Sequence, residues 1–176
     1  MASITPIEDL EDLVGRIASP YRDIYRAAAT EAVAFLELVR VHASREGFAG
    51  RLAWRGATLV GFAYGFTGLP GQTWRDEMAS HLGPDISMEW LEGYFEFAQF
   101  GVVTAERRKG LGSRLHDELL TAVPHHRAVL TVIEENGPAR GFYSKRDWQE
   151  LGTGFVTTGG NGPYVIMGRD LTTGLH

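Results

Sequence analysis

The chain of 176 residues is long enough for one domain with a sizeable core, and its apolar and charged fractions, 44% and 22%, are ordinary for a globular protein. Its formal net charge of −5 argues against general nucleic-acid binding, because phosphate contacts need a basic face. It contains no cysteine, which excludes disulfides, thiolate catalysis and cysteine-ligated metals and favours a reducing cytoplasm.

The first expected elements are two helices. Residues 6–18 and 22–46 have helical character, and a break is predicted at Ser19-Pro20 because proline disfavours a helical conformation of the residue before it. The opening MASITPIEDLEDL is acidic and lacks an apolar run, so no signal peptide is expected.

A hairpin is expected next, with strands at 51–55 and 58–66 around a turn at Arg55-Gly56. The longest uncharged run, 57–74, contains four glycines and a proline. It therefore indicates a strand followed by a loop, and no membrane span is expected.

The middle of the chain predicts short helical pieces around 75–82 and 85–92. The segment 94–103, YFEFAQFGVV, is rich in aromatic and β-branched residues and is expected to form a strand. A helix follows from about Gly110, and AVLTVIE, 128–134, is predicted as a buried strand.

The C-terminal part predicts a short helix at 137–146 and two strands, 148–157 and 163–170, joined by the turn TTGGNGP. The order of strands and helices indicates an α/β fold with a mixed sheet and helices on both faces. No repeat or long linker is visible, so residues 1–176 are expected to form a single domain.

The stretch RRKGLGSRLHDELL, 107–120, places cations and two glycines before a helix with leucines every four residues. The first turn of a helix leaves amides without partners, and anions bind there, most commonly phosphate. Gly110 and Gly112 let a ligand approach the backbone closely. The flanking cations are Arg107, Arg108, Lys109 and Arg114. The stretch therefore predicts a pyrophosphate cradle, and the alternative is an ordinary strand-to-helix turn with a solvated basic loop.

The same stretch matches neither GxxxxGK[ST] nor GxGxxG, which weakens a nucleotide-binding interpretation. Its pattern R-x-x-G-x-G, at Arg107, Gly110 and Gly112, resembles the acyl-CoA signature of the GNAT superfamily of N-acyltransferases. The similarity extends to Val102, eight residues before Gly110, and to ENGPARGFYSKRDW, 135–148, which resembles the family's second motif. The resemblance implies a mostly antiparallel mixed sheet with a splayed central strand pair, and acetyl-CoA as the cofactor.

The resemblance also implies which residues hold coenzyme A. The backbone at Val102, Val103 and Thr104 would pair with the pantetheine arm, and the N–H groups from Arg108 to Ser113 would hold the pyrophosphate, with Arg107 also among the cofactor-binding residues. The far side of the arm would be lined by Asn136, Ala139, Phe142 and Tyr143. The segment 107–113 comprises Arg107, Arg108, Lys109, Gly110, Leu111, Gly112 and Ser113.

The chain departs from the family pattern at two positions. Thr104 stands where many members have proline, which matters little. Asp147 stands where a glycine usually precedes the aromatic residue, and this puts the geometry of the local turn in doubt.

Acyl transfer to an amine needs a base, since an alkylamine with a pKa near ~10.4 is mostly protonated at neutral pH, and an acid for the leaving thiolate. Tyr143 matches the family's general acid by position; the alternative is a packed aromatic residue. Glu96, six residues before Val102 on the same strand face, is the candidate base. The alternative for Glu96 is a merely solvated charge, and Glu92 is the reserve base. Gln99 cannot serve as a base.

No histidine, aspartate or glutamate spacing indicates a metal site, so no metal is expected. His116 and Asp117 are expected to face solvent on the helix that follows Gly110. Tyr64, Trp74 and Trp90 are candidates for an aromatic acceptor pocket, and core packing is the alternative.

These observations predict an acetyl-CoA-dependent N-acetyltransferase that acts by direct transfer on a primary amine, foremost of a small molecule. Three alternatives stay open: an aminoglycoside-type antibiotic acetyltransferase, a non-catalytic acyl-CoA sensor, and a nucleotide-binding protein. A peptide N-terminus or a lysine is the second choice of acceptor. Since members of the superfamily often dimerise, a homodimer is also expected.

Overall fold

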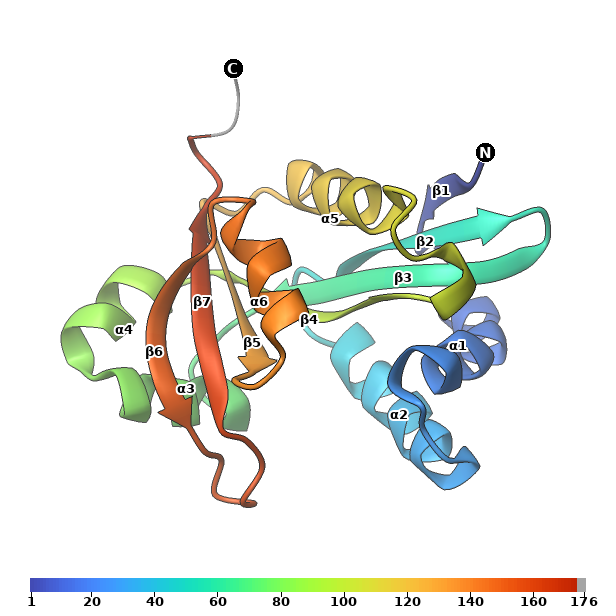
Figure 1. Ribbon diagram of the computed structural model, residues 1–176. Helices are drawn as coiled ribbons and strands as arrows, with labels where there is room; N and C mark the ends of the chain where they lie inside the picture. Colours follow the sequence, from blue (N-terminus) through green and yellow to red (C-terminus); the bar gives the residue numbers. More distant parts are fainter. Residues whose placement is uncertain (174–176) are drawn as a thin grey trace. The chain divides into compact units, whose positions relative to one another are not determined.

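The computed structural model describes residues 1–173, and these form a mixed α/β structure (Figure 1). The helices are α1 (Leu10–Tyr25), α2 (Ala29–Ala43), α3 (Thr73–Leu82), α4 (Pro84–Trp90), α5 (Leu111–Ala122) and α6 (Gly137–Ser144), with a 3₁₀ turn at Thr104–Glu106. The strands are β1 (Ser3–Pro6), β2 (Ala49–Arg55), β3 (Thr58–Thr67), β4 (Phe95–Val102), β5 (Arg127–Ile133), β6 (Gln149–Phe155) and β7 (Tyr164–Asp170).

Within the described residues, the strands follow the order β1-β2-β3-β4-β5-β7-β6. β1 pairs with β2, β2 with β3, β5 with β7 and β6 with β7 in antiparallel fashion. β4 and β5 are parallel, and their ladder joins only Phe95 with Ala128 and Glu96 with Val129 in the part of the chain described. The mostly antiparallel mixed sheet expected from the sequence is confirmed, and the short β4–β5 ladder is its exception.

The chain forms two compact units. Unit 1 contains Met1–Phe66 and Phe97–Val123, and unit 2 contains Thr67–Glu96 and the chain from Pro124 onward. Strand β4 contributes its first two residues to unit 2 and the rest to unit 1. None of the helices in residues 1–173 is both long and apolar enough to cross a lipid bilayer.

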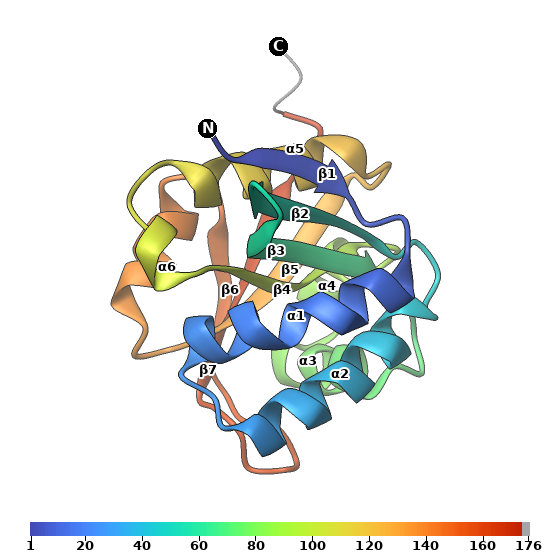
Figure 2. The same ribbon diagram turned by 90° about the vertical axis from the view of Figure 1, so that its right-hand side faces the viewer.

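In unit 1, helices cover both faces of the β2–β3 hairpin (Figure 2). Alternation along β2 turns Leu52 towards α1 and α2 and Ala53 towards α5. In β3, Phe62 faces α1 and α2 whereas Val60 faces α5, because the β2–β3 ladder shifts register at Ala53/Trp54. The first cluster is completed by Leu13, Ile17, Phe35, Val39, Leu59 and Tyr64. The second is completed by Ala2, Val102, Leu111 and Leu115. This packing fixes α5 and the end of β4 within one unit.

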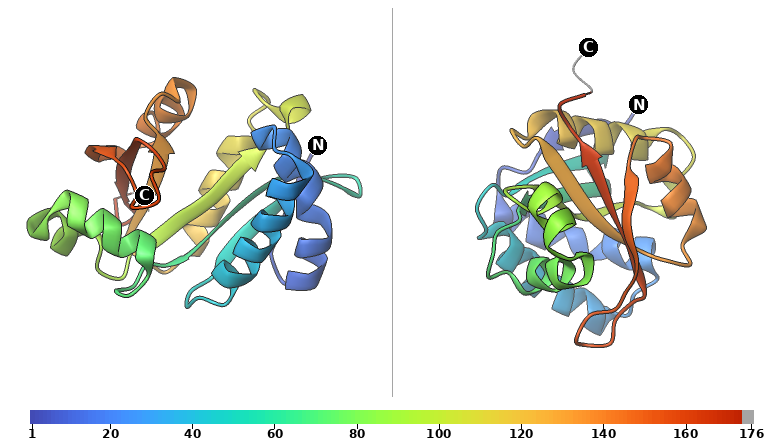
Figure 3. Two further views of the ribbon diagram at one scale, coloured as in Figure 1. Left: turned by 90° about the horizontal axis from the view of Figure 1, so that it is seen from below. Right: turned by 90° about the vertical axis from the view of Figure 1, so that its left-hand side faces the viewer.

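In unit 2, α3 and α4 lie on one side of the β5, β6 and β7 strands, and α6 lies on the opposite side (Figure 3). The core contains Met78 of α3, Trp90 of α4, Val129 of β5, Phe155 of β6 and Ile166 of β7, together with Leu91 and Tyr94 from the segment between α4 and β4. The described helices α3 and α4 agree with the predicted pieces at 75–82 and 85–92.

The N-terminal prediction was wrong in three respects. Ser3–Pro6 forms a strand, α1 continues through the predicted break at Ser19-Pro20 to Tyr25, and α2 covers only Ala29–Ala43 of the predicted 22–46. Pro20 removes one helical hydrogen bond, but it shares a buried face with Leu13 and Ile17. Burial of this face offsets the missing bond. Asp9 begins the helix by accepting hydrogen bonds from the amides of Glu11 and Asp12.

Candidate active site

Helix α5 begins at the glycine-containing segment Arg108–Ser113, which we call the α5 mouth. Gly110 is the N-cap, with φ of 80°, and its side chain cannot satisfy an amide of the first turn. The amide of Arg114 donates to the carbonyl of Gly110 at 3.2 Å, so the regular helical bonds start there. Apart from its neighbours in the chain, no described residue has an atom within 4 Å of a Cβ placed on Gly110. The backbone at Gly110 is therefore open to a close approach.

Three cations near the α5 mouth brace the surrounding backbone. Arg107 donates from Nε to the carbonyl of Val102 at 3.1 Å and from a terminal nitrogen to the carbonyl of Ile24 at 3.1 Å. Lys109 and Arg114 donate to the carbonyls of Ala105 and Ala2. The positive charge predicted by the sequence is therefore present, but these side chains also hold the loop in place.

The backbone at the end of β4 takes part in internal hydrogen bonds. The amide of Val103 donates to the carbonyl of Val60 at 2.9 Å, and the amide of Thr104 donates to the Asp23 carboxylate at 2.6 Å. An amide has one proton, whereas a carbonyl oxygen has two lone pairs. The carbonyls of Val102, Val103 and Thr104 each accept one internal hydrogen bond, from Arg107 Nε and from the amides of Glu106 and Arg107. Pairing with a pantetheine arm at these residues would therefore use the second lone pair of a carbonyl oxygen more readily than the amides of Val103 and Thr104.

The α5 mouth fits a diphosphate. The first-turn amides carry the positive end of the helix dipole, and the glycine N-cap leaves the approach open. The nearby guanidinium and ammonium groups add positive potential. The residues that would hold the diphosphate are those of Arg108–Ser113, and the chemistry of this donor set is selective for an anion.

The second motif builds α6 in unit 2. The side-chain oxygen of Asn136 accepts a hydrogen bond from the amide of Ala139 at 3.2 Å and thereby caps the helix. The guanidinium of Arg146 lies 3.7 Å from the ring centre of Phe142. Tyr143 is buried and contacts the ring of Trp148 edge-on at 5.7 Å. Its position is compatible with both the acid role and the packing role.

Asp147 adopts the conformation that the sequence put in doubt. Its φ is 63°, in the left-handed region where the family's glycine is favoured. Aspartate tolerates this region better than most residues. The turn returns the amide of Trp148 to the carbonyl of Tyr143 at 3.3 Å. The departure from the family pattern thus preserves the expected turn.

Glu96 is buried in unit 2, with 6% of its surface exposed. The Tyr94 hydroxyl donates to its Oε2 at 2.6 Å. The alternative of a merely solvated charge is therefore wrong. Sequence reasoning missed Tyr94, although the two-residue alternation of a strand places positions 94 and 96 on one face.

The three aromatic candidates for an acceptor pocket contribute to packing. Tyr64 has 0% of its surface exposed and lies in the core of unit 1. Trp90 belongs to the core of unit 2, and Trp74 packs against that core. These positions agree with the packing alternative, and a role in acceptor binding stays a prediction.

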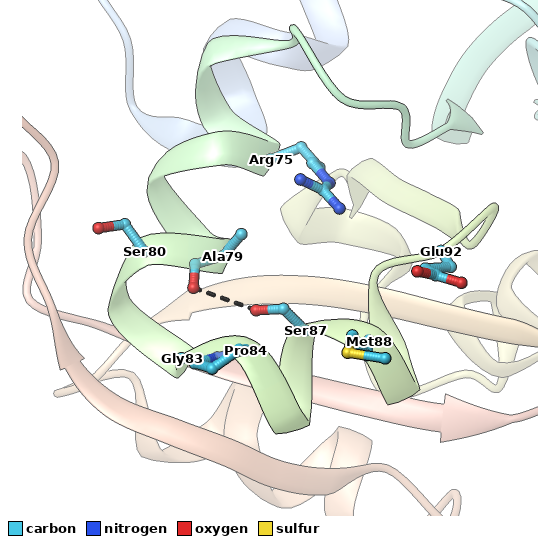
Figure 4. A pocket seen from close by; sticks show the side chains of 8 residues that line it. All are labelled: Arg75, Ala79, Ser80, Gly83, Pro84, Ser87, Met88 and Glu92. Carbon is cyan, nitrogen blue, oxygen red and sulfur yellow. Dashed lines mark hydrogen bonds between the residues drawn. The ribbon is translucent and has the colours of Figure 1, made fainter.

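A pocket of about 410 Å³ opens between α3 and α4 in unit 2 (Figure 4). Its two charged residues are Arg75 and the reserve base Glu92. The hydroxyl of Ser87 donates to the carbonyl of Ala79 across the pocket at 3.0 Å (Figure 4). The remaining lining residues are Ser80, Gly83, Pro84 and Met88. Sequence reasoning did not identify this pocket.

Two histidines in unit 1 are buried. His116 was expected to face solvent, but 0% of its surface is exposed, and its Nδ1 lies 2.7 Å from the Asp117 carboxylate. The expectation failed because the buried stripe of α5 includes Leu120, four residues further on, as well as the leucines at 111, 115 and 119. Nδ1 of His42 lies 3.1 Å from the Tyr64 hydroxyl. Burial, followed by the charge of Arg45, lowers the pKa of His42 to about 4.

A mixed sheet in which a central strand is followed by a helix with a glycine N-cap is the arrangement of acyl-CoA-dependent N-acyltransferase folds, and this chain has it. Residues 8–148 match the acetyltransferase (GNAT) family, which is most of the chain. The protein belongs to this family, whose members use acetyl-CoA as the acyl donor.

Individual relatives agree with this assignment. A GCN5-like protein acetyltransferase of Mycobacterium tuberculosis is 28% identical over 123 residues, which are 65% of this chain and 60% of that protein. The chain thus spans less than two thirds of this relative's length. The ribosomal-protein-S18-alanine N-acetyltransferase of Escherichia coli shares the fold, with a TM-score of 0.64, 13% identity and coverage of 97% of this chain and 94% of the other.

A structure containing the cofactor has the same fold. The PaiA N-acetyltransferase of Thermoplasma acidophilum, crystallised with coenzyme A, has a TM-score of 0.59 and 17% identity over 96% of this chain and 99% of the other. The identities to both structures are low, so these likenesses establish the fold alone.

Proposed function

We propose that the protein transfers the acetyl group of acetyl-CoA directly to a primary amine, foremost of a small molecule. The observation that carries the proposal is the open α5 mouth in a chain of this family. Acetyl-CoA supplies an acetyl thioester. The segment Arg108–Ser113 holds its diphosphate with Arg107 beside it, and the carbonyl side of Val102–Thr104 orients its pantetheine arm.

In this proposal Glu96 is the general base and Tyr143 the general acid. An alkylamine attacks only as the neutral form, so Glu96 accepts the ammonium proton, directly or through water. Tyr143 donates its phenolic proton to the departing sulfur, whose conjugate thiol has a pKa near ~8.5, and the second proton lost by the nitrogen as the amide forms restores the phenol through water. Asn136 supports the acid role because it caps the helix that carries Tyr143.

Direct transfer is supported by composition. The chain has no cysteine, so an acyl-cysteine intermediate cannot form. Holding amine and thioester in line is worth ~7–11 kcal/mol of the barrier in well-oriented systems. Positioning therefore supplies a large part of the proposed rate, and loss of the base slows the reaction without abolishing it.

A protein amine is the second candidate acceptor. The relative from M. tuberculosis is named a protein acetyltransferase, which favours a lysine or an N-terminus. The net charge of −5 favours a cationic acceptor of either size. The assay described next also distinguishes the small-molecule and protein acceptors from the aminoglycoside-type acetyltransferase and the acyl-CoA sensor.

The test is release of free coenzyme A thiol, followed by absorbance, with acetyl-CoA and a panel of small amines, aminoglycosides and lysine peptides. We expect turnover on at least one small primary amine and slower turnover on peptides. Acetylation of peptides alone would contradict a small-molecule acceptor and show that the acceptor is a protein amine. Tight coenzyme A binding with no release on any amine would establish the sensor and contradict the proposed activity.

We further propose a cytoplasmic protein that forms a homodimer and binds no nucleic acid. The absence of cysteine agrees with a reducing compartment, and the acidic charge disfavours phosphate backbones. Sedimentation at micromolar concentration tests the dimer, and a monomer at all concentrations would contradict it.

A further inference from the structure

We propose that Tyr94 is a positioning residue that holds the Glu96 carboxylate in the orientation in which it accepts the proton of the acceptor amine. This inference rests on the proposed function, because it assigns Glu96 as the base. Tyr94 itself does not contact the reacting atoms in this proposal. Its effect passes through the hydrogen bond that its hydroxyl donates to Oε2 of Glu96 at 2.6 Å.

Burial makes this hydrogen bond effective. Tyr94 has 1% and Glu96 has 6% of its surface exposed. A hydrogen bond between a hydroxyl and a carboxylate is stronger than one between neutral groups, and a low local dielectric strengthens it further. A carboxylate has about four lone-pair sites, so the hydrogen bond from the phenol does not by itself prevent Glu96 from accepting a proton.

The phenol ring is itself held in place. The backbone of Gly68 lies against its face, so that a Cβ at position 68 would lie 2.1 Å from Cε1 of Tyr94. The amide of Gly68 also donates to the carbonyl of Tyr94 at 2.9 Å. The ring packs in the core of unit 2 with Met78 and Trp90. A glycine is therefore required at position 68 for this ring position.

The start of β4 explains why the pair points in one direction. Tyr94 stands immediately before the strand and Glu96 is its second residue, and the hydrogen bond between their side chains places both on the same side of the chain. Glu96 is also fixed by its register with Val129 of β5. Backbone pairing places the Cα of Glu96, and the Tyr94 hydroxyl selects its side-chain orientation. A base held in this way rarely populates rotamers in which it cannot accept the proton.

The matched variants are Tyr94→Phe, Glu96→Gln and the double variant, with Tyr164→Phe as control. Tyr164 packs against the same core, and loss of its hydroxyl reports the general effect of removing a phenol from unit 2. We expect kcat of Glu96→Gln to fall about 100-fold. We expect kcat of Tyr94→Phe to fall about tenfold, with the KM for acetyl-CoA unchanged.

The double variant decides the mechanism of the effect. If Tyr94 acts through Glu96, Tyr94→Phe slows the wild type but has no further effect in the Glu96→Gln background. Equal tenfold losses in both backgrounds would overturn the inference, as would an unchanged kcat of Tyr94→Phe. Full activity of Glu96→Gln would overturn the base and the positioning role together, whereas the acetyltransferase proposal would survive.

A readout besides activity keeps the test independent of turnover. In protein labelled with ¹³C at glutamate carboxyls, the Glu96 resonance is assigned by its loss in Glu96→Gln. We expect Tyr94→Phe to move this resonance and Tyr164→Phe to leave it in place. A resonance that does not respond to Tyr94→Phe would contradict the hydrogen bond on which the proposal depends.

Discussion

At the scale of single residues, Asp147 shows how a departure from a family pattern is accommodated. The turn after α6 requires a left-handed residue, and aspartate adopts φ of 63° there. Residues without a short polar side chain pay roughly 1–2 kcal/mol in this region. The requirement comes from the turn geometry, and the residue type only determines its energetic cost.

We therefore expect Asp147→Ala to lower the free energy of unfolding by about 1 kcal/mol, whereas Asp147→Gly keeps or raises it. Urea denaturation of the two variants beside the wild type measures the difference. Equal midpoints for the alanine and glycine variants would mean that position 147 does not depend on a left-handed backbone.

His42 makes the stability of the protein depend on pH. Its pKa is lowered to about 4 in the folded state, first by burial and then by the charge of Arg45, against an ordinary value of 6.5. Between these pH values the unfolded state binds more protons than the folded state. Stability is therefore fully present above pH 6.5 and falls as the pH falls towards 4.

The expected loss over this window is about 3 kcal/mol from His42 alone. His42→Gln, which keeps a hydrogen-bonding partner for Tyr64, removes this contribution. Free energies of unfolding measured from pH 7 to pH 4 should fall less steeply in the variant. Parallel curves for the two proteins would show that His42 does not remain neutral in the folded state.

At the scale of an element, α5 is where the sequence predicts function best. Its leucine spacing gives a helix, and the two glycines before and inside its first turn place open amides at its start. Both properties are local, so the sequence determines them. The partners of Arg107, the carbonyls of Val102 and Ile24, depend on tertiary packing and could not be predicted from the motif.

Gly110→Ala tests the α5 mouth. Alanine at φ of 80° is strained, and its methyl group points into the space that the ligand would occupy. We expect coenzyme A binding, measured by calorimetry, to weaken at least about tenfold, corresponding to ~1.4 kcal/mol.

The matched control is Gly15→Ala in the interior of α1, where an added Cβ meets no atom within 4 Å and the backbone is helical. This variant should gain roughly 0.5–1 kcal/mol of stability and bind coenzyme A as the wild type does. Weakened binding in both variants would attribute the effect to the fold in general and not to the α5 mouth.

Helix α1 shows the limit of local reasoning at the same scale. Pro20 predicts a break, and its removal of a hydrogen bond is real. The helix nevertheless continues, because Leu13 and Ile17 are buried against the hairpin of unit 1 and Pro20 is buried on the same helix. A sequence pattern indicates the hydrogen bond that a proline removes from a helix. It does not indicate how much apolar surface a particular helix face buries in the folded protein.

At the scale of the whole molecule, a ligand that binds only the folded state stabilises it. Coenzyme A at one hundred times its dissociation constant should add about 2.7 kcal/mol, which for a chain of this size corresponds to roughly 5–10 °C in Tm. Thermal unfolding with coenzyme A, ATP and NAD at equal concentrations measures this. Stabilisation by ATP or NAD in preference to coenzyme A would favour a nucleotide-binding protein.

The sequence by itself determined the order of the strands and helices from 51 onward and the helix that begins at Gly110, because these depend on local spacing and backbone chemistry. The family was indicated by the resemblance of two motifs to known members. Only the tertiary structure decided which side chains are buried together. It placed Glu96 under the Tyr94 hydroxyl and His116 in the interior of unit 1. Burial and hydrogen-bond partners arise from residues that meet only after folding, and no local pattern contains them.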